Sequence, residues 1–396
     1  PEPTDFKTDF WFDEWHIQCR YGKVMTPEFY RKCMELLKKY HLVSYPTFRT
    51  IGRELIIYLE ENGDLTFDFS KIDQYLEAAV ENGLTMINIS FTNNYFQIRD
   101  YFKVINVIER KTGKRFKLVV NNPNELTKKF LKDIYNHIIE KKWFTPDKIY
   151  CDILDEPWSR EAKEKLIEAS KIVHSAIPSI KTYAAGAYPK MGVDGYIDVW
   201  CPQIRQFKED DYEKGEELWW YQCLYKVPYP TFSINRPGIE LRTLFWICWK
   251  YNVSGFLYWT SIGWETSDMV SKGVINENNK WADENFLVVF DGTDFPGDGV
   301  FFYPTSEGLI PSIRAVNIRE GIDDWEYLNI LSKYYKACKE KNINIPENIE
   351  KEIKILLNVP EEIVISPRKY TYSIELIENT REKIADMIVY LQKILK

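Results

Sequence analysis

Residues 148–157 read KIYCDILDEP, and this stretch decides the fold class of the chain. The apolar run up to Leu154 predicts a buried strand, and Asp155-Glu156-Pro157 follows directly at its end. The proline stops the strand, and Ser159 is a suitable N-cap for the amphipathic helix that comes next. A buried strand followed at once by a helix is the unit from which parallel sheets are built, so the stretch predicts an α/β protein.

The same alternation of strands and helices continues along most of the chain. Further strands are predicted at 9–15, 43–48, 85–90, 116–120, 181–185, 197–201, 218–223 and 255–259. A hairpin is predicted at 54–69 and a helix at 99–111. About eight strand–helix pairs predict a (β/α)8 TIM-type barrel over residues 1–340, and an open, Rossmann-like sheet is the alternative. Residues 341–396 read as a C-terminal helical extension packed on the barrel.

Composition argues against several classes of function. The net charge is −7 with both signs well mixed, which argues against a nucleic-acid partner, and no apolar run is long enough for membrane insertion. The chain has no Cys-x-x-Cys spacing and no glycine-rich nucleotide loop, so we expect it to bind no metal and no cofactor. Each scattered histidine is read as structural: His16, His41, His137 and His174.

Compartment and assembly are weakly marked in the sequence. Most of the seven cysteines lie in apolar stretches and read as free buried thiols, which slightly favours the cytoplasm. The chain begins at Pro1 and not at a methionine, so secretion with a preceding signal or domain is the alternative. The oligomeric state is left open.

The pair Asp155-Glu156 is the best candidate for catalysis. In barrel enzymes the chemistry lies at the C-terminal ends of the strands, where this pair is expected. A carboxylic acid is the group that protonates the leaving oxygen of a glycosidic bond, so the pair favours a glycoside hydrolase. The alternative is that Asp155 caps the next helix and Glu156 forms a surface salt bridge.

Aromatic residues make up 15% of the chain, and several follow predicted strands. The face of a tryptophan stacks well on the apolar face of a sugar ring, so aromatic side chains at a barrel mouth would bind a glycan. The candidates for substrate binding are Trp200, Trp220, Tyr221, Tyr258, Trp259 and Trp264. The alternative is that they belong to the packed core.

The motifs of the chain resemble glycoside hydrolase family 123 and the related domain-of-unknown-function 4091 proteins. The motif that first suggests the family is 151–157 (CDILDEP), and the resemblance covers about residues 8 to 331. Further motifs follow in the family's order: 198–202 (DVWCP), 218–221 (LWWY), 242–246 (RTLFW), 255–259 (GFLYW), 299–304, 312–314 (SIR) and 319–328 (REGIDDWEYL).

The resemblance implies a retaining β-N-acetylgalactosaminidase with a (β/α)8 barrel, which uses the 2-acetamido group of its substrate as the nucleophile. Glu156 would act as the acid/base, and Asp155 would hold the acetamido N–H. Tyr221 is the candidate for a hydroxyl near the acetamido oxygen. Family members usually carry an N-terminal β-sandwich, whereas this chain starts at the barrel, which leaves the preferred sugar open.

Two alternatives to this mechanism remain. In a double displacement, Glu156 would be the acid/base and Glu265, next to Trp264, the nucleophile. Barrels of that kind typically carry Asn-Glu-Pro at this strand end, so Asp155 favours the acetamido route. The other alternative is a carbohydrate-binding barrel that does not hydrolyse its ligand.

Overall fold

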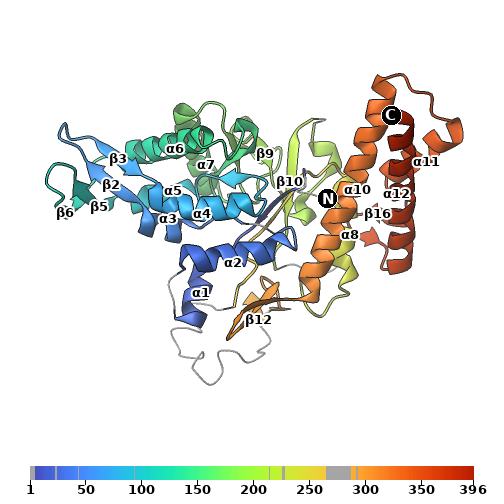
Figure 1. Ribbon diagram of the computed structural model, residues 1–396, viewed down its shortest axis with the longest axis horizontal. Coiled ribbons are helices and arrows are strands. Elements are labelled where there is room, and N and C mark those ends of the chain that lie inside the picture. The colour runs from blue at the N-terminus through green and yellow to red at the C-terminus, as the bar shows by residue number, and fades with distance from the viewer. Residues whose placement is uncertain are drawn as a thin grey trace.

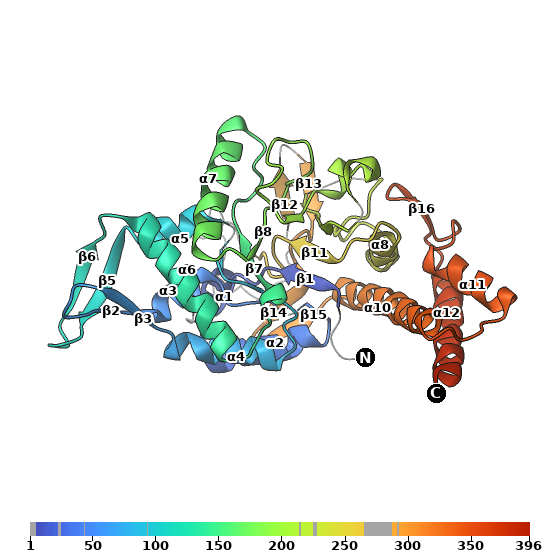
Figure 2. The same ribbon diagram turned by 90° about the horizontal axis from the view of Figure 1, so that it is seen from above.

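The computed structural model describes residues 5–22, 25–42, 44–92, 94–213, 215–224, 228–264, 287–290 and 293–396. Its centre is a curved parallel sheet with the strand order β1-β11-β10-β9-β8-β7-β4 (Figures 1 and 2). The strands are β1 (Lys7–Phe10), β4 (Ile87–Asn88), β7 (Ile149–Asp152), β8 (Lys181–Tyr183), β9 (Val199–Trp200), β10 (Glu217–Tyr221) and β11 (Gly255–Tyr258). The predicted α/β class and its parallel, TIM-like arrangement are confirmed.

The predicted eighth strand is not formed in the described part of the chain. Residues 44–47, from the predicted strand 43–48, lie between the edge strands β1 and β4 without ladder pairing. On one side Phe48 N–H donates to Phe91 O over 2.7 Å, just beyond β4. Pro46 lacks the N–H that a central strand must donate, which explains the interruption. The closed barrel of eight strands is therefore corrected to a curled sheet of seven.

Helices surround the outer face of this sheet (Figure 2). They are α2 (Pro27–Lys38), α4 (Ser70–Glu81), α6 (Pro123–Glu140), α7 (Arg160–Ala176), α8 (Ile239–Lys250) and α10 (Ile313–Glu340). In α2 the buried positions are 30, 33, 34 and 37, the spacing of one helix face. The predicted cap of α7 is present, because Ser159 Oγ accepts a hydrogen bond from Ala162 N at 3.1 Å.

A separate sheet with the order β3-β2-β5-β6 forms the end of the molecule farthest from the C-terminal helices (Figure 1). Its first hairpin, β2 (Ile56–Leu59) and β3 (Leu65–Asp68), was predicted at 54–69. The helix predicted at 99–111 is wrong, since only α5 (Tyr95–Tyr101) is helical and β5 (Val104–Glu109) and β6 (Arg115–Val119) follow. Residues 104–107 alternate between exposed and buried, the period of a strand.

Both hairpins are insertions at the carboxyl side of the central sheet. The first follows α3 (Phe48–Glu54), and the second follows α5. Shorter elements on the same side of the sheet are α1 (Glu14–Tyr21), directly after β1, and two hairpins formed by β12 (Leu287–Phe290) with β13 (Thr293–Pro296) and by β14 (Phe302–Thr305) with β15 (Gly308–Pro311).

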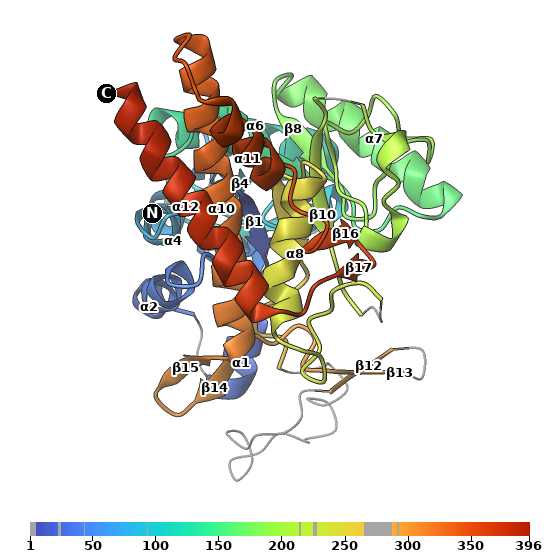
Figure 3. The same ribbon diagram turned by 90° about the vertical axis from the view of Figure 1, so that its right-hand side faces the viewer.

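The C-terminal helices α11 (Glu347–Leu357) and α12 (Ile374–Leu395) lie beside α10. The chain that joins them forms the small hairpin β16 (Val364–Ser366) and β17 (Lys369–Tyr370), which lies next to α8 (Figure 3). Arg381 on α12 donates to Glu320 on α10 at 2.9 Å. Arg242 on α8 binds Asp324 on α10 at 2.6 Å. Residues 341–396 thus contact the helices that cover the sheet, and their separation at 340 as a unit stays a prediction. Among the described helices, none is long and apolar enough to span a bilayer.

The inner face of the sheet is layered. At its amino end, Glu217 accepts a hydrogen bond from Tyr150 at 2.8 Å and pairs with Lys7 at 3.2 Å and Lys181 at 2.5 Å. Trp219 fills the next layer. Gly255 is required there, because a Cβ on it would lie 2.8 Å from the Trp219 ring. The described interior is therefore a packed core, and in folds of this kind ligands bind at the carboxyl end.

Candidate active site

The pair Asp155-Glu156 lies just beyond β7, at the carboxyl edge of the sheet. The main-chain N–H of Glu156 donates to Ala185 O at 2.8 Å, which ties the turn to the end of β8. Glu156 has φ +46°, a left-handed conformation that is rare for a residue with a long side chain. Strained backbone of this kind is concentrated at functional sites, where the surrounding structure holds it in place.

Tyr221, the last residue of β10, reaches across to this carboxylate. Its hydroxyl donates to Glu156 Oε1 at 2.8 Å. Burial and then the charge of Glu156 raise the pKa of Tyr221, so the phenol keeps its proton and remains a donor. Burial, followed by the charge of Glu156, also raises the pKa of the nearby Cys223 thiol, which is therefore not a thiolate nucleophile at neutral pH.

A glycine next to the pair makes room for an indole. Gly186 has φ +86°, and a Cβ on it would lie 2.6 Å from Nε1 of Trp158. Trp158 is 41% exposed and follows Glu156 by two residues. A large, half-exposed aromatic side chain beside a carboxylate pair offers a surface on which a sugar can pack.

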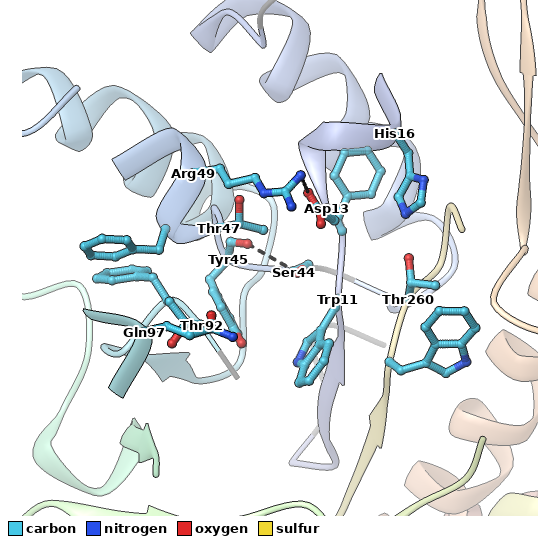
Figure 4. A pocket seen from close by; sticks show the side chains of 14 residues that line it. Trp11, Asp13, His16, Ser44, Tyr45, Thr47, Arg49, Thr92, Gln97 and Thr260 are labelled. Carbon is cyan, nitrogen blue, oxygen red and sulfur yellow. Dashed lines mark hydrogen bonds and ion pairs between the residues drawn. The ribbon is translucent and has the colours of Figure 1, made fainter. Parts of the chain in front are cut away.

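A pocket of about 350 Å³ opens at the carboxyl ends of β1, β4 and β11 (Figure 4). Its wall contains Trp11, Asp13, His16, Ser44, Tyr45, Thr47, Arg49, Thr92, Gln97, Trp259 and Thr260. Arg49 lies 3.5 Å from Asp13 and makes no hydrogen bond to the described residues. Thr47 Oγ1 is buried and also lacks a partner among them. Indole faces combined with hydroxyl, amide and guanidinium groups suit a polyhydroxylated ligand.

The pocket and the pair share one side of the sheet. Thr92 lines the pocket, and Asn94, two residues later, forms a β-bridge with Leu154, directly before the pair. On the other flank, Trp259 Nε1 lies 3.4 Å from Oδ1 of Asp298. The other oxygen of Asp298 accepts a hydrogen bond from Leu224 N, in the segment that follows Tyr221. The pair itself does not line the pocket, but segments that contact Leu154 and that follow Tyr221 lead to its two walls.

Two fully buried acids lie inside the sheet below this mouth. Asp9 on β1 accepts a hydrogen bond from Tyr183 at 2.7 Å, and burial raises the pKa of Asp9 to about 6. Neither carboxylate oxygen of Asp152 on β7 has a partner among the described residues. Burial, with the charges of Asp155 and Asp9, raises the pKa of Asp152, which favours its neutral form.

Comparisons with known proteins identify the family of the chain. The family model "Glycoside hydrolase 123, catalytic domain" matches residues 23–331, more than half of the chain. The chain belongs to glycoside hydrolase family 123. The resemblance seen in the sequence motifs is thereby confirmed.

Two solved structures resemble this family 123 chain. A family 123 glycoside hydrolase from Clostridium perfringens, described for glycolipid glycan hydrolysis, has a TM-score of 0.55 at 18% identity, covering 99% of this chain and 70% of that one. An endo-β-1,4-mannanase from Thermotoga petrophila has a TM-score of 0.41 at 13% identity, covering 81% and 76%. The first likeness supports the fold. A comparison with curated proteins finds no match.

The structure separates the aromatic residues that the sequence offered as sugar-binding. Tyr221 contacts Glu156, and Trp259 lines the pocket. Trp220 is fully buried on the opposite face of β10, against Phe207 and Tyr251. Successive strand residues face opposite sides, so Tyr221 and Trp220 cannot both point inward.

The other three aromatic candidates are likewise not brought to the pocket. Trp200 points outward and donates to Glu216 at 2.9 Å. Trp264 is buried and donates to Phe302 O at 2.7 Å. The ring of Tyr258 lies in the core, and its hydroxyl donates to Asp298. We therefore correct the predicted platform for these residues, since each one packs in a wall of the family 123 fold.

The remaining candidate residues divide in the same way. His41, His137 and His174 pair with Asp323, Asp73 and Asp198 at 3.0, 2.7 and 3.1 Å, whereas His16 lines the pocket. The described residues hold no group of three or more side chains suited to a metal ion. Glu265, the alternative nucleophile, lies outside the described residues.

Proposed function

We propose that this family 123 chain is a retaining exo-glycoside hydrolase that removes terminal β-linked N-acetylgalactosamine, or another N-acetylhexosamine. The reaction proceeds by substrate-assisted catalysis through an oxazolinium intermediate. The observation that carries the proposal is the hydrogen bond from Tyr221 to Glu156, directly beside Asp155 at the carboxyl edge of the sheet. It gives two adjacent carboxyl groups different surroundings, as two different roles require.

In the first step Glu156 donates its proton to the glycosidic oxygen, and the bond from that oxygen to the anomeric carbon breaks. The acetamido carbonyl oxygen of the substrate bonds to the same carbon, so the intermediate is a cyclic oxazolinium cation. Asp155 accepts a hydrogen bond from the acetamido N–H and offsets the positive charge as it develops. No second carboxylate is needed on the far side of the sugar.

In the second step water attacks the anomeric carbon and gives its proton to Glu156. The bond to the acetamido oxygen breaks, and the product keeps the β configuration after two inversions. The sequence suggested that Tyr221 serves the acetamido oxygen. Its contact supports a role at Glu156 instead, where the phenol orients the carboxylate for proton transfer in both steps.

The pocket supports a small glycan end as the bound group. Its volume is at the lower end of the range for small-ligand sites. Trp11 and Trp259 offer indole faces within it, and Arg49, Gln97 and Thr92 offer hydrogen bonds to hydroxyl groups. The Clostridium perfringens relative is described for glycolipid glycan hydrolysis, and a glycolipid glycan is the class of substrate we propose to test first.

The test is turnover of aryl β-glycosides of N-acetylgalactosamine, N-acetylglucosamine and galactose by wild type, Asp155→Asn and Glu156→Gln. Removing a group that acts in the transition state is expected to cost about 10²–10⁴-fold in kcat/KM. Glu168→Gln, an exposed residue of α7, is the matched control and is expected to retain activity. Unchanged turnover in both variants of the pair would overturn the proposal.

The same assay separates the alternatives. If Glu265 were the nucleophile of a double displacement, galactosides without an acetamido group would be cleaved as well as N-acetylgalactosaminides. If the protein only binds glycans, calorimetry would detect binding with no hydrolysis over long incubation. Our proposal requires the acetamido substrates to be preferred and turned over.

A further inference from the structure

Asp298 lies where two loops of the candidate site meet, and none of the reaction steps above uses it. Its side chain is 4% exposed. Oδ2 accepts a hydrogen bond from the N–H of Leu224 at 2.7 Å, and Oδ1 accepts from the Tyr258 hydroxyl and, more weakly at 3.4 Å, from the Trp259 indole N–H. One carboxylate thus joins the end of β11 to the segment that follows β10.

The bond to Leu224 holds a strained residue. Leu224 has φ +44°, in the left-handed region that a branched side chain seldom occupies. It follows Tyr221 by three residues, and Tyr221 is the donor to Glu156. Burial raises the pKa of Asp298 to about 7, but Oδ2 can accept this main-chain N–H in either protonation state, so the contact fixes the path of the chain directly after Tyr221.

The chain around Asp298 is also shaped to Trp259. Gly299 has φ +79°, and a Cβ on it would lie 2.6 Å from Cζ2 of Trp259. The N–H of Gly299 donates to the Tyr258 hydroxyl at 2.9 Å. One edge of the indole is therefore enclosed by residues 298–299, while the side chain still contributes to the wall of the pocket.

Arg314, near the start of α10, holds residues 297–300 in place through hydrogen bonds to their main chain. It is buried, and its guanidinium donates to Phe232 O at 2.6 Å and to the carbonyl oxygens of Gly297 and Val300. These donors bind main-chain carbonyls on both sides of Asp298. Arg314 therefore does not occupy the Asp298 carboxylate, which accepts its hydrogen bonds from Leu224, Tyr258 and Trp259.

We propose that Asp298 is a positioning residue of the glycosidase. It sets the Trp259 indole in the pocket wall and, through Leu224, fixes the segment that presents Tyr221 to Glu156. Asp298 does not touch the substrate in this scheme. The inference rests on the proposed function for the roles of Trp259 and Glu156.

The kinetic test is Asp298→Asn, with the exposed Asp210→Asn as the matched control. The substitution replaces one of the two acceptor oxygens by an amide NH₂ group, and we expect kcat/KM to fall by about 10- to 100-fold, with a rise in KM because the indole is no longer fixed. Because Asp298 acts in part through Trp259, the same change made in a Trp259→Ala background is expected to cost at least about threefold less than in wild type. Full additivity of the two changes would overturn the inference.

A second readout does not depend on activity. Hydrogen exchange followed by mass spectrometry is expected to show faster exchange at Leu224 in Asp298→Asn, with unchanged exchange in α7. Unchanged exchange at Leu224 would contradict the inference even if wild type cleaved no N-acetylgalactosaminide, so its failure is distinguishable from that of the proposed function. If Asp298→Asn does not fold, Tyr258→Phe removes the hydroxyl that donates to Asp298 and accepts from Gly299, and it is expected to raise KM by about two- to fivefold.

Discussion

The pKa values of buried acids are shifted in opposite directions at the two ends of the curved sheet. At the amino end, burial opposes ionisation of Glu217, but the charge of Lys7 and a hydrogen bond from Lys181 outweigh it and lower the pKa of Glu217. Toward the carboxyl end, neither Asp9 nor Asp152 pairs with a cation among the residues that the structure describes, and burial raises both pKa values. The amino end is arranged for stability, and the carboxyl end keeps polar groups that stability alone does not favour.

The largest effect that would test this comparison is expected at the amino end. Glu217→Ala removes the partner of Lys7, Lys181 and Tyr150, so two partly buried ammonium groups lose their compensating charge. We expect a loss of about 3–5 kcal/mol in the free energy of unfolding, measured by denaturant titration. The exposed Glu213→Ala is expected to stay within about 0.5 kcal/mol of wild type. Equal effects of the two changes would break the comparison.

Toward the carboxyl end, removing the charge of a buried acid is expected to increase the free energy of unfolding. The folded pKa of Asp9 is about 6, above the unfolded value of about 3.9, so its contribution to stability is complete below pH 4 and is lost as the pH rises through 6. Asp9→Asn removes this loss while keeping an acceptor for Tyr183. Thermal unfolding is therefore expected to show a gain of about 2 kcal/mol at pH 7 and little change at pH 4.

The control for this pH effect is Asp386→Asn, an exposed residue of α12. It is expected to show no difference from wild type between pH 4 and 7. A destabilised Asp9→Asn at pH 7 would mean that the ionised form of Asp9 is part of the native structure.

The smallest effect is expected for Tyr221→Phe, which removes one hydrogen bond to Glu156 and keeps the ring. We expect kcat/KM to fall about tenfold, equivalent to about 1.4 kcal/mol, with unfolding stability changed by less than about 1 kcal/mol. Tyr135→Phe on α6 is the control. An unchanged pH profile and rate for Tyr221→Phe would remove the phenol from the mechanism.

Local sequence was enough to predict the units of the fold. The strand before Asp155, the Ser159 cap and the hairpin at 54–69 all depend on neighbouring residues, and each is present. The helix predicted at 99–111 failed because β5 pairs with β2 and β6, and such tertiary pairing overrides local propensity. Pro46 was the signal that the eighth strand would be interrupted.

The candidate site was predictable only in part. The carboxylate pair was marked by its place after a strand, whereas Trp11 was missed because β1 ends at Phe10 and not at residue 15. Trp220 and Tyr221 are adjacent, and a shift of one residue exchanges the two faces of a strand. Asp298 and Arg49 have no local motif, since their roles arise from contacts with distant segments.

The central claim is that the acetamido group of the substrate is the nucleophile, with Glu156 as acid/base and Asp155 as its partner. The most direct test is kcat/KM for aryl β-N-acetylgalactosaminides in which the acetyl group carries zero to three fluorine atoms. Fluorine withdraws electrons from the carbonyl oxygen and weakens it as a nucleophile. Substrate-assisted catalysis predicts a steep fall in kcat/KM with each added fluorine, whereas a rate independent of fluorination would rule out the acetamido group as the nucleophile.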